Sequence, residues 1–130
     1  MAKLTDVMKA MITGQSVWVA TSGADGKANL AIKGSAKIVD DEHLAYFEMV
    51  GNRTWANLQK NPWVALAVAD SSKIKGYRFE GKAAIITSGP LYEEAIKLGE
   101  LMKMPSPPKA AVKVTIEEIY DLGKGGMKIA

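Results

Sequence analysis

The sequence predicts a mainly β domain with α additions, in which six antiparallel strands form a small barrel with short flanking helices. Six segments rich in strand-forming residues follow one another at hairpin spacing, and three amphipathic segments are inserted among them. The chain has 130 residues, of which 48% are apolar and 24% charged, an ordinary composition for a globular protein. We therefore expect residues 1–130 to form a single domain.

The N-terminal part predicts a helix followed by a hairpin. Apolar residues recur at helical spacing over residues 3–13, and Gly14 follows as a stop signal. Residues 16–22 are rich in strand formers, and Asp25-Gly26 is a typical hairpin turn. We expect residues 28–39 to form the second strand of this hairpin.

The central part predicts two strands around a short helix. Residues 43–49 form the third strand. A helix over residues 52–60 ends at Asn61-Pro62, because the residue before proline avoids the helical conformation. Residues 63–70 are mostly apolar, so this fourth strand is expected to be buried on both faces.

The C-terminal part predicts a long strand, a helix and a last strand. Residues 74–87 form the fifth strand, in which interior glycines suggest bulges or bends. An amphipathic helix follows over residues 89–104, and the sixth strand covers residues 110–122. Residues 124–130 are glycine-rich and are expected to be a flexible tail.

Composition excludes several kinds of catalytic site. The chain has no cysteine and one histidine, which removes disulfides, thiolate nucleophiles and Cys/His zinc sites. His43 follows three acidic residues at a tight turn, where we expect solvated side chains rather than a metal site. We therefore predict no metal and no catalytic residue of the chain's own, and expect a cofactor to supply any difficult chemistry.

Charge and hydropathy patterns limit the partners. The net charge is +3 with scattered lysines, which suits an anionic ligand as well as nucleic acid. No apolar run approaches the roughly 20 residues of a membrane-spanning helix, and the N-terminal segment does not have the pattern of a signal peptide. We expect no membrane association and a cytoplasmic location.

The strongest local signal is a cation at the start of the short helix. Arg53 and Thr54 follow Gly51 and the expected N-cap Asn52. A helix N-terminus is already partly positive, so a bound anion would explain why a cation is placed there. Lys33, in a half-apolar strand, is a second candidate contact for the same anion. Solvated surface side chains at both positions are the alternative.

These residues lie in a longer segment with a family resemblance. The segment from Asn29 to Val68, NLAIKGSAKIVDDEHLAYFEMVGNRTWANLQKNPWVALAV, resembles the FMN-binding split-barrel proteins related to pyridoxamine 5′-phosphate oxidase. The shared pattern is a strand ending near lysine, a strand leading into an Arg-Thr pair, and a helix closed by Asn-Pro before an apolar strand. The resemblance implies a Greek-key split barrel, an FMN cofactor and a homodimer with FMN at the interface.

The resemblance also implies the cofactor-binding residues. The strand before Lys33 would lie beside the isoalloxazine ring, while Lys33 itself would approach the phosphate or the polar side of the ring. The end of the third strand would flank the ribityl chain and the ring. The start of the short helix would hold the phosphate, with Asn57 in support. The residues are Leu30, Ala31, Ile32, Lys33, Phe47, Glu48, Arg53, Thr54 and Asn57.

Departures from the family pattern limit the expected activity. Thr54 stands where the oxidase has a lysine, and Ala28 stands where it has an arginine. The C-terminal sequence VTIEEIYDLGKGGMKIA has no counterpart of the oxidase's substrate-binding arginine and histidine segments. The chain therefore resembles the small stand-alone FMN-binding members of the family. This resemblance implies an oxidoreductase or electron carrier rather than a true pyridoxamine 5′-phosphate oxidase. In related dimers, a tail such as residues 124–130 would lie near the partner's flavin.

Two alternatives stay open. The same barrel hosts deazaflavin- and haem-binding relatives, because fold does not fix function. A nucleic-acid-binding barrel would use Trp55, Tyr77 or Phe79 as stacking platforms, whereas Trp18 and Trp63, on apolar strands, are expected in the core. Such a barrel would spread its cations along several phosphates. Because we expect the two cations to converge on one phosphate, we predict no nucleic-acid partner.

Overall fold

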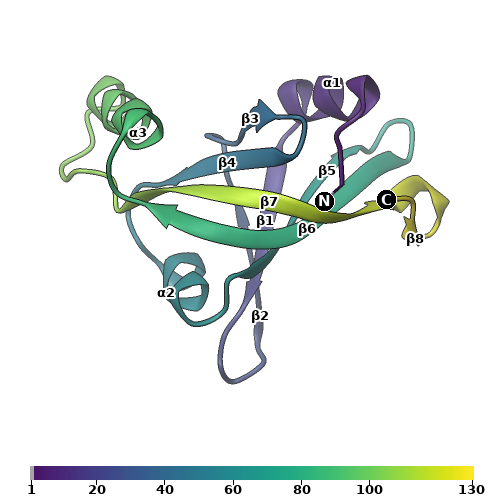
Figure 1. Ribbon diagram of the computed structural model, residues 1–130, viewed down its shortest axis with the longest axis horizontal. Coiled ribbons are helices and arrows are strands. Elements are labelled where there is room, and N and C mark those ends of the chain that lie inside the picture. Colours follow the sequence, from purple (N-terminus) through teal and green to yellow (C-terminus); the bar gives the residue numbers. More distant parts are fainter. Residues whose placement is uncertain (1) are drawn as a thin grey trace.

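The computed structural model describes residues 2–130, which form one antiparallel sheet with three α-helices around it (Figure 1). The α-helices are α1 (Asp6–Gly14), α2 (Arg53–Lys60) and α3 (Pro90–Leu101). The strands are β1 (Val17–Ser22), β2 (Ala28–Ile32), β3 (Lys37–Asp40), β4 (His43–Glu48), β5 (Trp63–Asp70), β6 (Lys75–Ile86), β7 (Ala110–Asp121) and β8 (Met127–Lys128), and a 3-10 helix covers Leu122–Lys124.

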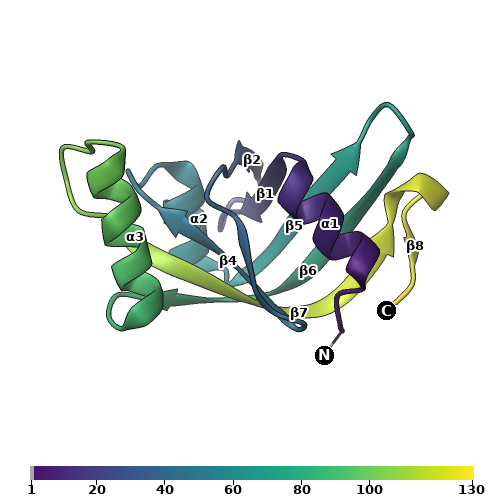
Figure 2. The ribbon, with the colours of Figure 1, turned by 90° about the horizontal axis from the view of Figure 1, so that it is seen from above.

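The sheet follows the strand order β2-β1-β5-β6-β7-β4-β3, with β8 added to β7. β2 and β3 therefore stand at opposite ends of this order, although only residues 33–36 separate them in the chain. Five Cα–Cα steps span at most about 18 Å, so the sheet must curl until its two ends lie close together. Within residues 2–130, no backbone pairing joins β2 to β3, and the curled sheet is a split barrel with an open seam (Figure 2).

Two apolar clusters hold the fold together. The larger one fills the barrel and includes Leu66, Phe79 and Ile116, and α1 packs against it through Met8. The smaller one lies under α3 and is built on Phe47. Figure 1 shows α1 and α3 at opposite ends of the sheet. Each helix therefore covers its own part of the apolar interior.

The first residues of the chain are tied to distant parts of the sheet. The backbone N–H of Ala2 donates to the Ile116 carbonyl at 3.0 Å, and that of Leu4 donates to the Asp41 carbonyl at 2.7 Å. The N-terminal segment thus joins β7 to the turn between β3 and β4 before α1 begins.

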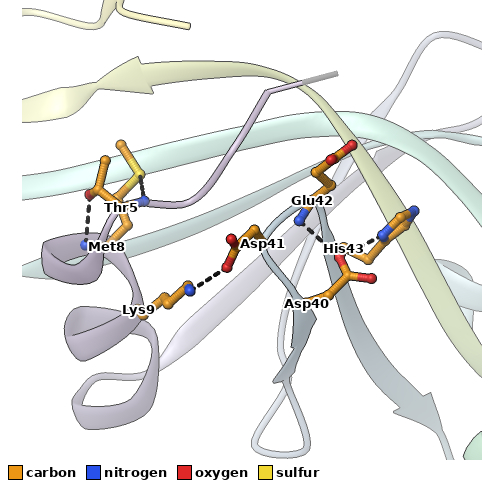
Figure 3. Close-up of polar contacts among 7 residues, drawn as sticks. All are labelled: Thr5, Met8, Lys9, Asp40, Asp41, Glu42 and His43. Atoms are coloured by element: carbon orange, nitrogen blue, oxygen red, sulfur yellow. Dashed lines mark hydrogen bonds and ion pairs between the residues drawn. The ribbon is translucent and has the colours of Figure 1, made fainter.

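α1 starts later than the sequence pattern predicted. It begins at Asp6 because Thr5 is its N-cap: the Met8 N–H donates to the Thr5 hydroxyl at 3.3 Å, and the Met8 sulfur accepts from the Thr5 N–H at 3.4 Å (Figure 3). Apolar periodicity alone does not distinguish the cap from the first turn. On the exposed side of α1, Lys9 forms an ion pair with Asp41.

The acidic turn between β3 and β4 is a structural turn. The Glu42 N–H donates to the Asp40 carboxylate at 2.8 Å, and His43 Nδ1 lies 2.7 Å from the same oxygen (Figure 3). These contacts lower the pKa of Asp40. Residues 2–130 contain no group of acidic or histidine side chains that could hold a metal ion. In the same part of the chain, no helix is both long and apolar enough to span a membrane.

The structure has eight strands where the sequence predicted six. The predicted strand over residues 28–39 is divided into β2 and β3, because Gly34 and Ser35 form a turn in which the Ala36 N–H donates to the Lys33 carbonyl at 3.2 Å. β8 supplies the other additional strand. The coarser prediction is confirmed: the protein is mainly β, with an antiparallel sheet and three helices.

Two tryptophans expected in the core lie on the outside of the barrel. Trp18 is 42% exposed, and the half-buried Trp63 donates its indole N–H to the Glu80 carboxylate at 3.1 Å. The neighbours of Trp18 on β1, Val17 and Val19, point inward instead. Both faces of this strand carry apolar residues, so alternation did not reveal which face is buried.

The predicted flexible tail folds back onto the sheet. Residues Leu122–Lys124 form the 3-10 helix, and β8 pairs with β7 so that Met127 lies opposite Asp121. Beyond β8, the Ile129 N–H donates to the Ile119 carbonyl at 2.9 Å. Glycine-rich composition predicted flexibility, but the consecutive glycines Gly125 and Gly126 have positive φ angles and form the turn that returns the chain.

Gly81 provides a test of the register between β6 and β7. A Cβ atom at this position would lie 1.8 Å from the Thr115 carbonyl oxygen, at the bulge that follows Glu80. Gly81→Ala should therefore destabilise the protein by at least about 3 kcal/mol, since backbone would have to move. Urea unfolding measures this loss. Gly14→Ala is the control, because its Cβ would meet no atom within 4 Å, and it should be neutral or stabilising.

Candidate functional site

The N-terminus of α2 is an exposed, electropositive helix end. Gly51, with φ +70°, leads the chain into the helix, and the Asn52 side chain caps it by accepting from the Thr54 N–H at 3.2 Å. The first turn contains no acidic residue. Arg53 is exposed and forms no ion pair within residues 2–130. The helix dipole, free N–H groups and a guanidinium thus present positive charge in one place.

Two hydrogen bonds between amide and hydroxyl side chains fix α2 against the first hairpin. The Asn29 amide on β2 donates to the Thr54 hydroxyl at 2.9 Å. The Asn57 amide donates to the Thr21 hydroxyl on β1 at 3.2 Å. Thr54, Asn57 and Thr21 are all buried, so these bonds are shielded from water. They hold the start of α2 at the Asn29 end of β2.

A buried ion pair marks the other end of β2. Lys33 Nζ lies 3.0 Å from Glu48 Oε2, with the Lys33 side chain 12% exposed and the Glu48 side chain fully buried. The same ammonium lies 5.3 Å from the centre of the Tyr46 ring. Burial, reinforced by the Glu48 carboxylate, raises the pKa of Tyr46, so its phenol remains protonated. Glu48 Oε1 and the Tyr46 hydroxyl are buried and have no hydrogen-bond partner among residues 2–130.

The connection between β2 and β3 is fastened to β4 beside this pair. The Phe47 N–H donates to the Ser35 hydroxyl at 2.9 Å, and the hydroxyl in turn lies 3.4 Å from the Phe47 carbonyl. A cavity of about 360 Å³ opens here. Its lining combines one ion pair with apolar side chains, namely Ile32, Lys33, Gly34, Ser35, Phe47, Glu48, Met49, Val50, Leu98 and Met102.

Between the two ends, β2 is an edge strand with a free side. The Lys33 N–H donates to the Val17 carbonyl on β1 at 2.9 Å, and backbone groups alternate in direction along an antiparallel strand. Leu30 and Ile32 therefore direct their N–H and C=O groups away from β1. Their side chains are 63% and 54% exposed. The strand from Asn29 to Lys33 is about 13 Å long, which separates the two ends of the site.

The structure brings the predicted residues together in two groups. Lys33, Phe47 and Glu48 share the cavity with Ile32, whereas Arg53, Thr54 and Asn57 belong to α2. Leu30 and Ala31 lie on the strand between these groups. Lys33 is not brought to the N-terminus of α2, because Glu48 holds its ammonium at the far end of β2. The roles of all nine residues in binding a cofactor stay predictions.

Sequence reasoning missed four residues that shape the site: Asn29, Thr21, Ser35 and Tyr46. Two of them were detectable by alternation. Asn29 and Lys33 have the same parity on β2, and Tyr46 and Glu48 have the same parity on β4, so each pair shares a face. Thr21 and Ser35 gave no local signal, because their partners are distant in the sequence.

The buried pair predicts an asymmetric response to substitution. Lys33→Met should destabilise the protein by roughly 3–5 kcal/mol, since it leaves a buried carboxylate unpaired. Combining it with Glu48→Gln should recover most of that loss. Lys37→Met, which breaks the exposed pair with Glu94 at 2.6 Å, should cost less than about 1 kcal/mol. Urea unfolding at neutral pH compares the variants, and equal losses for both lysines would contradict the assignment.

Comparisons with known proteins place the chain among its relatives. The chain matches the family described as pyridoxamine 5′-phosphate oxidase over residues 4–123. It is 31% identical to an uncharacterized protein of Methanocaldococcus jannaschii over 125 residues, covering 95% of this chain and 83% of that protein.

Among solved structures, HupZ of Group A Streptococcus is 33% identical with a TM-score of 0.85, covering 98% of this chain and 99% of that one. A Lactobacillus delbrueckii protein, described as a candidate pyridoxamine 5′-phosphate oxidase, is 27% identical with a TM-score of 0.74, covering 91% and 93%.

More distant structures share the fold and differ in what their names say they bind or do. An FMN-binding protein of Syntrophomonas wolfei is 19% identical with a TM-score of 0.75, covering 88% of this chain and 83% of that one. An F420 reductase is 18% identical with a TM-score of 0.67, covering 89% of this chain and 98% of that one. The heme storage protein HutZ of Vibrio cholerae is 17% identical with a TM-score of 0.68, covering 91% of this chain and 94% of that one. With its split barrel and a family match over nearly its whole length, this chain belongs to the pyridoxamine 5′-phosphate oxidase family.

Proposed function

We propose that the protein is an FMN-binding flavoprotein that acts as a small oxidoreductase or electron carrier. The observation that carries the proposal is the two-ended site along β2. The positive N-terminus of α2 lies beside Asn29, near the start of β2. A cavity with a buried ion pair lies at Lys33, at the other end of β2, and the free edge of β2 runs between them. FMN has the matching chemistry, with an anionic phosphate at one end and a flat ring with a polar edge at the other.

The α2 end suits the phosphate. Arg53 offers a planar guanidinium, and the Thr54 hydroxyl, which accepts from Asn29, still has its own proton to donate. The helix N-terminus adds backbone N–H groups. Thr54 in place of a lysine leaves one fewer charge at this end, so Arg53 should carry most of the electrostatic attraction.

The cavity end suits a ring edge. Glu48 Oε1 is a buried acceptor without a donor, and a flavin ring carries an N–H group between two carbonyls on its polar edge. The free N–H and C=O groups of Leu30 and Ile32 offer matching partners along the strand. When bound, the flavin would supply the redox chemistry. The chain's own residues would hold and orient it and exclude water from the cavity.

Of the three alternatives, haem and nucleic acid are less well supported than FMN. A deazaflavin shares the ring and phosphate chemistry and fits the same observations, so it is the nearest rival. Haem commonly needs an axial ligand, and the only histidine, His43, is held by Asp40 at the opposite end of β4 from Glu48. A nucleic-acid surface would need exposed aromatic rings, but of the three rings named above Phe79 is 1% exposed, and Trp55 and Tyr77 are half-buried against the core.

We also propose a homodimer that completes the site. The outer face of β1 and β2 presents Trp18 beside Ile32, and Leu30 beside Ala20. β5 continues this face, with Ala67 opposite Trp18. The result is an apolar surface adjoining the free edge of β2. An isologous contact through this surface would bury it and supply a second wall for the ring.

Arg53→Ala tests the phosphate end. The substitution should weaken FMN binding by about 2 kcal/mol, more than tenfold, because it removes a charge-assisted hydrogen bond. Riboflavin, which lacks the phosphate, should bind weakly and equally to both proteins. Lys60→Ala, at the other end of the same helix, is the control and should leave FMN affinity unchanged.

Titration of the apoprotein followed by visible absorption and flavin fluorescence gives these affinities. Equal losses for FMN and riboflavin would show that Arg53 acts on folding and not on phosphate. A protein that stays colourless with excess FMN would sink the proposal, and tighter binding of a deazaflavin or of haemin would replace it.

Trp18→Glu tests the dimer. A carboxylate in the centre of the apolar outer face should dissociate the dimer, because it would be desolvated without a partner. FMN affinity should fall with it, since the site would lose its second wall. Leu101→Glu, at an 81% exposed position on α3, is the matched control and should change neither property. Analytical ultracentrifugation with FMN titration decides: a wild-type monomer with full FMN affinity would rule out a shared site.

A further inference from the structure

A second surface, outside the proposed flavin site, surrounds the turn between β5 and β6. Ile74 in this turn has φ +51°, in the left-handed region that β-branched residues strongly disfavour. The turn lies close to the C-terminal segment, because the Ile74 carbonyl oxygen is only 2.8 Å from the position that a Cβ of Gly123 would take. Nevertheless the Ile74 side chain is 82% exposed. Within this chain, an isoleucine here adds strain and gains no burial.

The surface around Ile74 is concave. A cavity of about 430 Å³ lies on the side of α1 and is lined by Val7, Met11 and Tyr77 together with the turn. A second cavity of about 250 Å³ lies on the side of Leu122. Both cavities are lined by Ile74. Val7, in the larger cavity, is itself 62% exposed, so water reaches the apolar lining on this side of Ile74.

The rim of this surface is basic. Lys73, Lys75 and Lys124 line the larger cavity and are exposed, and none of them forms an ion pair within residues 2–130. Asp121 is the only acidic residue of that cavity. Asp70 lines the smaller cavity, so three lysines stand against two carboxylates around Ile74 and the surface keeps a net positive charge. An apolar centre within a net positive rim complements an apolar group flanked by carboxylates.

We propose that this surface docks an acidic segment of a partner protein, with an apolar side chain of the partner seated beside Ile74 and its carboxylates on Lys73, Lys75 and Lys124. The two concave sides favour a protruding side chain over a flat lipid surface. Burial would then give Ile74 the contacts it lacks in the isolated chain. This surface is distinct from the β2 site, so the proposal does not rest on flavin binding.

Ile74→Asn separates binding from folding. Asparagine tolerates a positive φ, so the variant should melt at a higher temperature than the wild type, while its binding should fall by about tenfold or more. If Ile74 had only a structural role, Ile74→Asn would lower both the melting temperature and the binding affinity. Leu101→Asn, at an equally exposed apolar position, is the matched control and should leave binding unchanged. Lys73→Glu with Lys75→Glu should abolish binding, whereas Lys27→Glu with Lys97→Glu should not.

The probe is a phage-displayed library of random linear peptides, selected on the wild-type protein and counter-selected on Ile74→Asn. Enriched peptides should be acidic, contain an apolar residue and bind more weakly in high salt, as measured by fluorescence anisotropy. No enrichment, enrichment of neutral or basic sequences, or equal binding to Ile74→Asn would overturn the proposal. The proposal would also be overturned if the wild-type protein bound phosphatidylserine vesicles but no peptide, and Ile74→Asn abolished the vesicle binding. Self-association of the wild-type chain that Ile74→Asn abolishes would overturn it as well.

Discussion

The ion pair between Lys33 and Glu48 is the interaction on which the rest of the structure depends. The two ends of the curled sheet are not joined by backbone hydrogen bonds, so side chains must hold the seam. Lys33, at the end of β2, forms an ion pair with Glu48 on β4. The Ser35 hydroxyl accepts a hydrogen bond from the backbone N–H of Phe47, the residue before Glu48. Removing the charges of Lys33 and Glu48 from water is unfavourable unless the two side chains form their ion pair. Glu48 can therefore lie inside the barrel only when Lys33 reaches it across the seam.

This arrangement supports the proposed site at both of its ends. β2 is an edge strand, and such strands are usually the least supported part of a sheet. Here it is fixed at one end by Lys33 and at the other by the bond between Asn29 and Thr54. The free edge between them is therefore held in position although no neighbouring strand of this chain covers it. A ligand or a second copy would meet a preformed surface, which lowers the entropy lost on binding.

The sequence predicted the order of elements well and their closure less well. Local patterns were sufficient for the cap at Asn52 and for the end of α2 at Asn61, because both depend on neighbouring residues. They failed at Trp18, where both faces of the strand are apolar and only tertiary packing decides which one is buried. They also placed Lys33 with Arg53, because the carboxylate that holds Lys33 lies 15 residues away and no local pattern reports it. The nine candidate residues lie in two groups linked by β2, and Asn29 and Ser35, which hold α2 and the connection after β2 in place, emerge only from contacts across the fold.

The contact between Ala2 and Ile116 has a consequence for synthesis on the ribosome. Ala2 cannot make this hydrogen bond until Ile116 has emerged, and β4 must likewise wait for β7. Such a high contact order delays folding, so β4 and β6, which both pair with β7, keep one edge unpaired until β7 has emerged. The nascent protein is therefore most vulnerable to aggregation just before β7 is released, and slowing translation earlier in the message would lengthen that exposure rather than help the barrel to form.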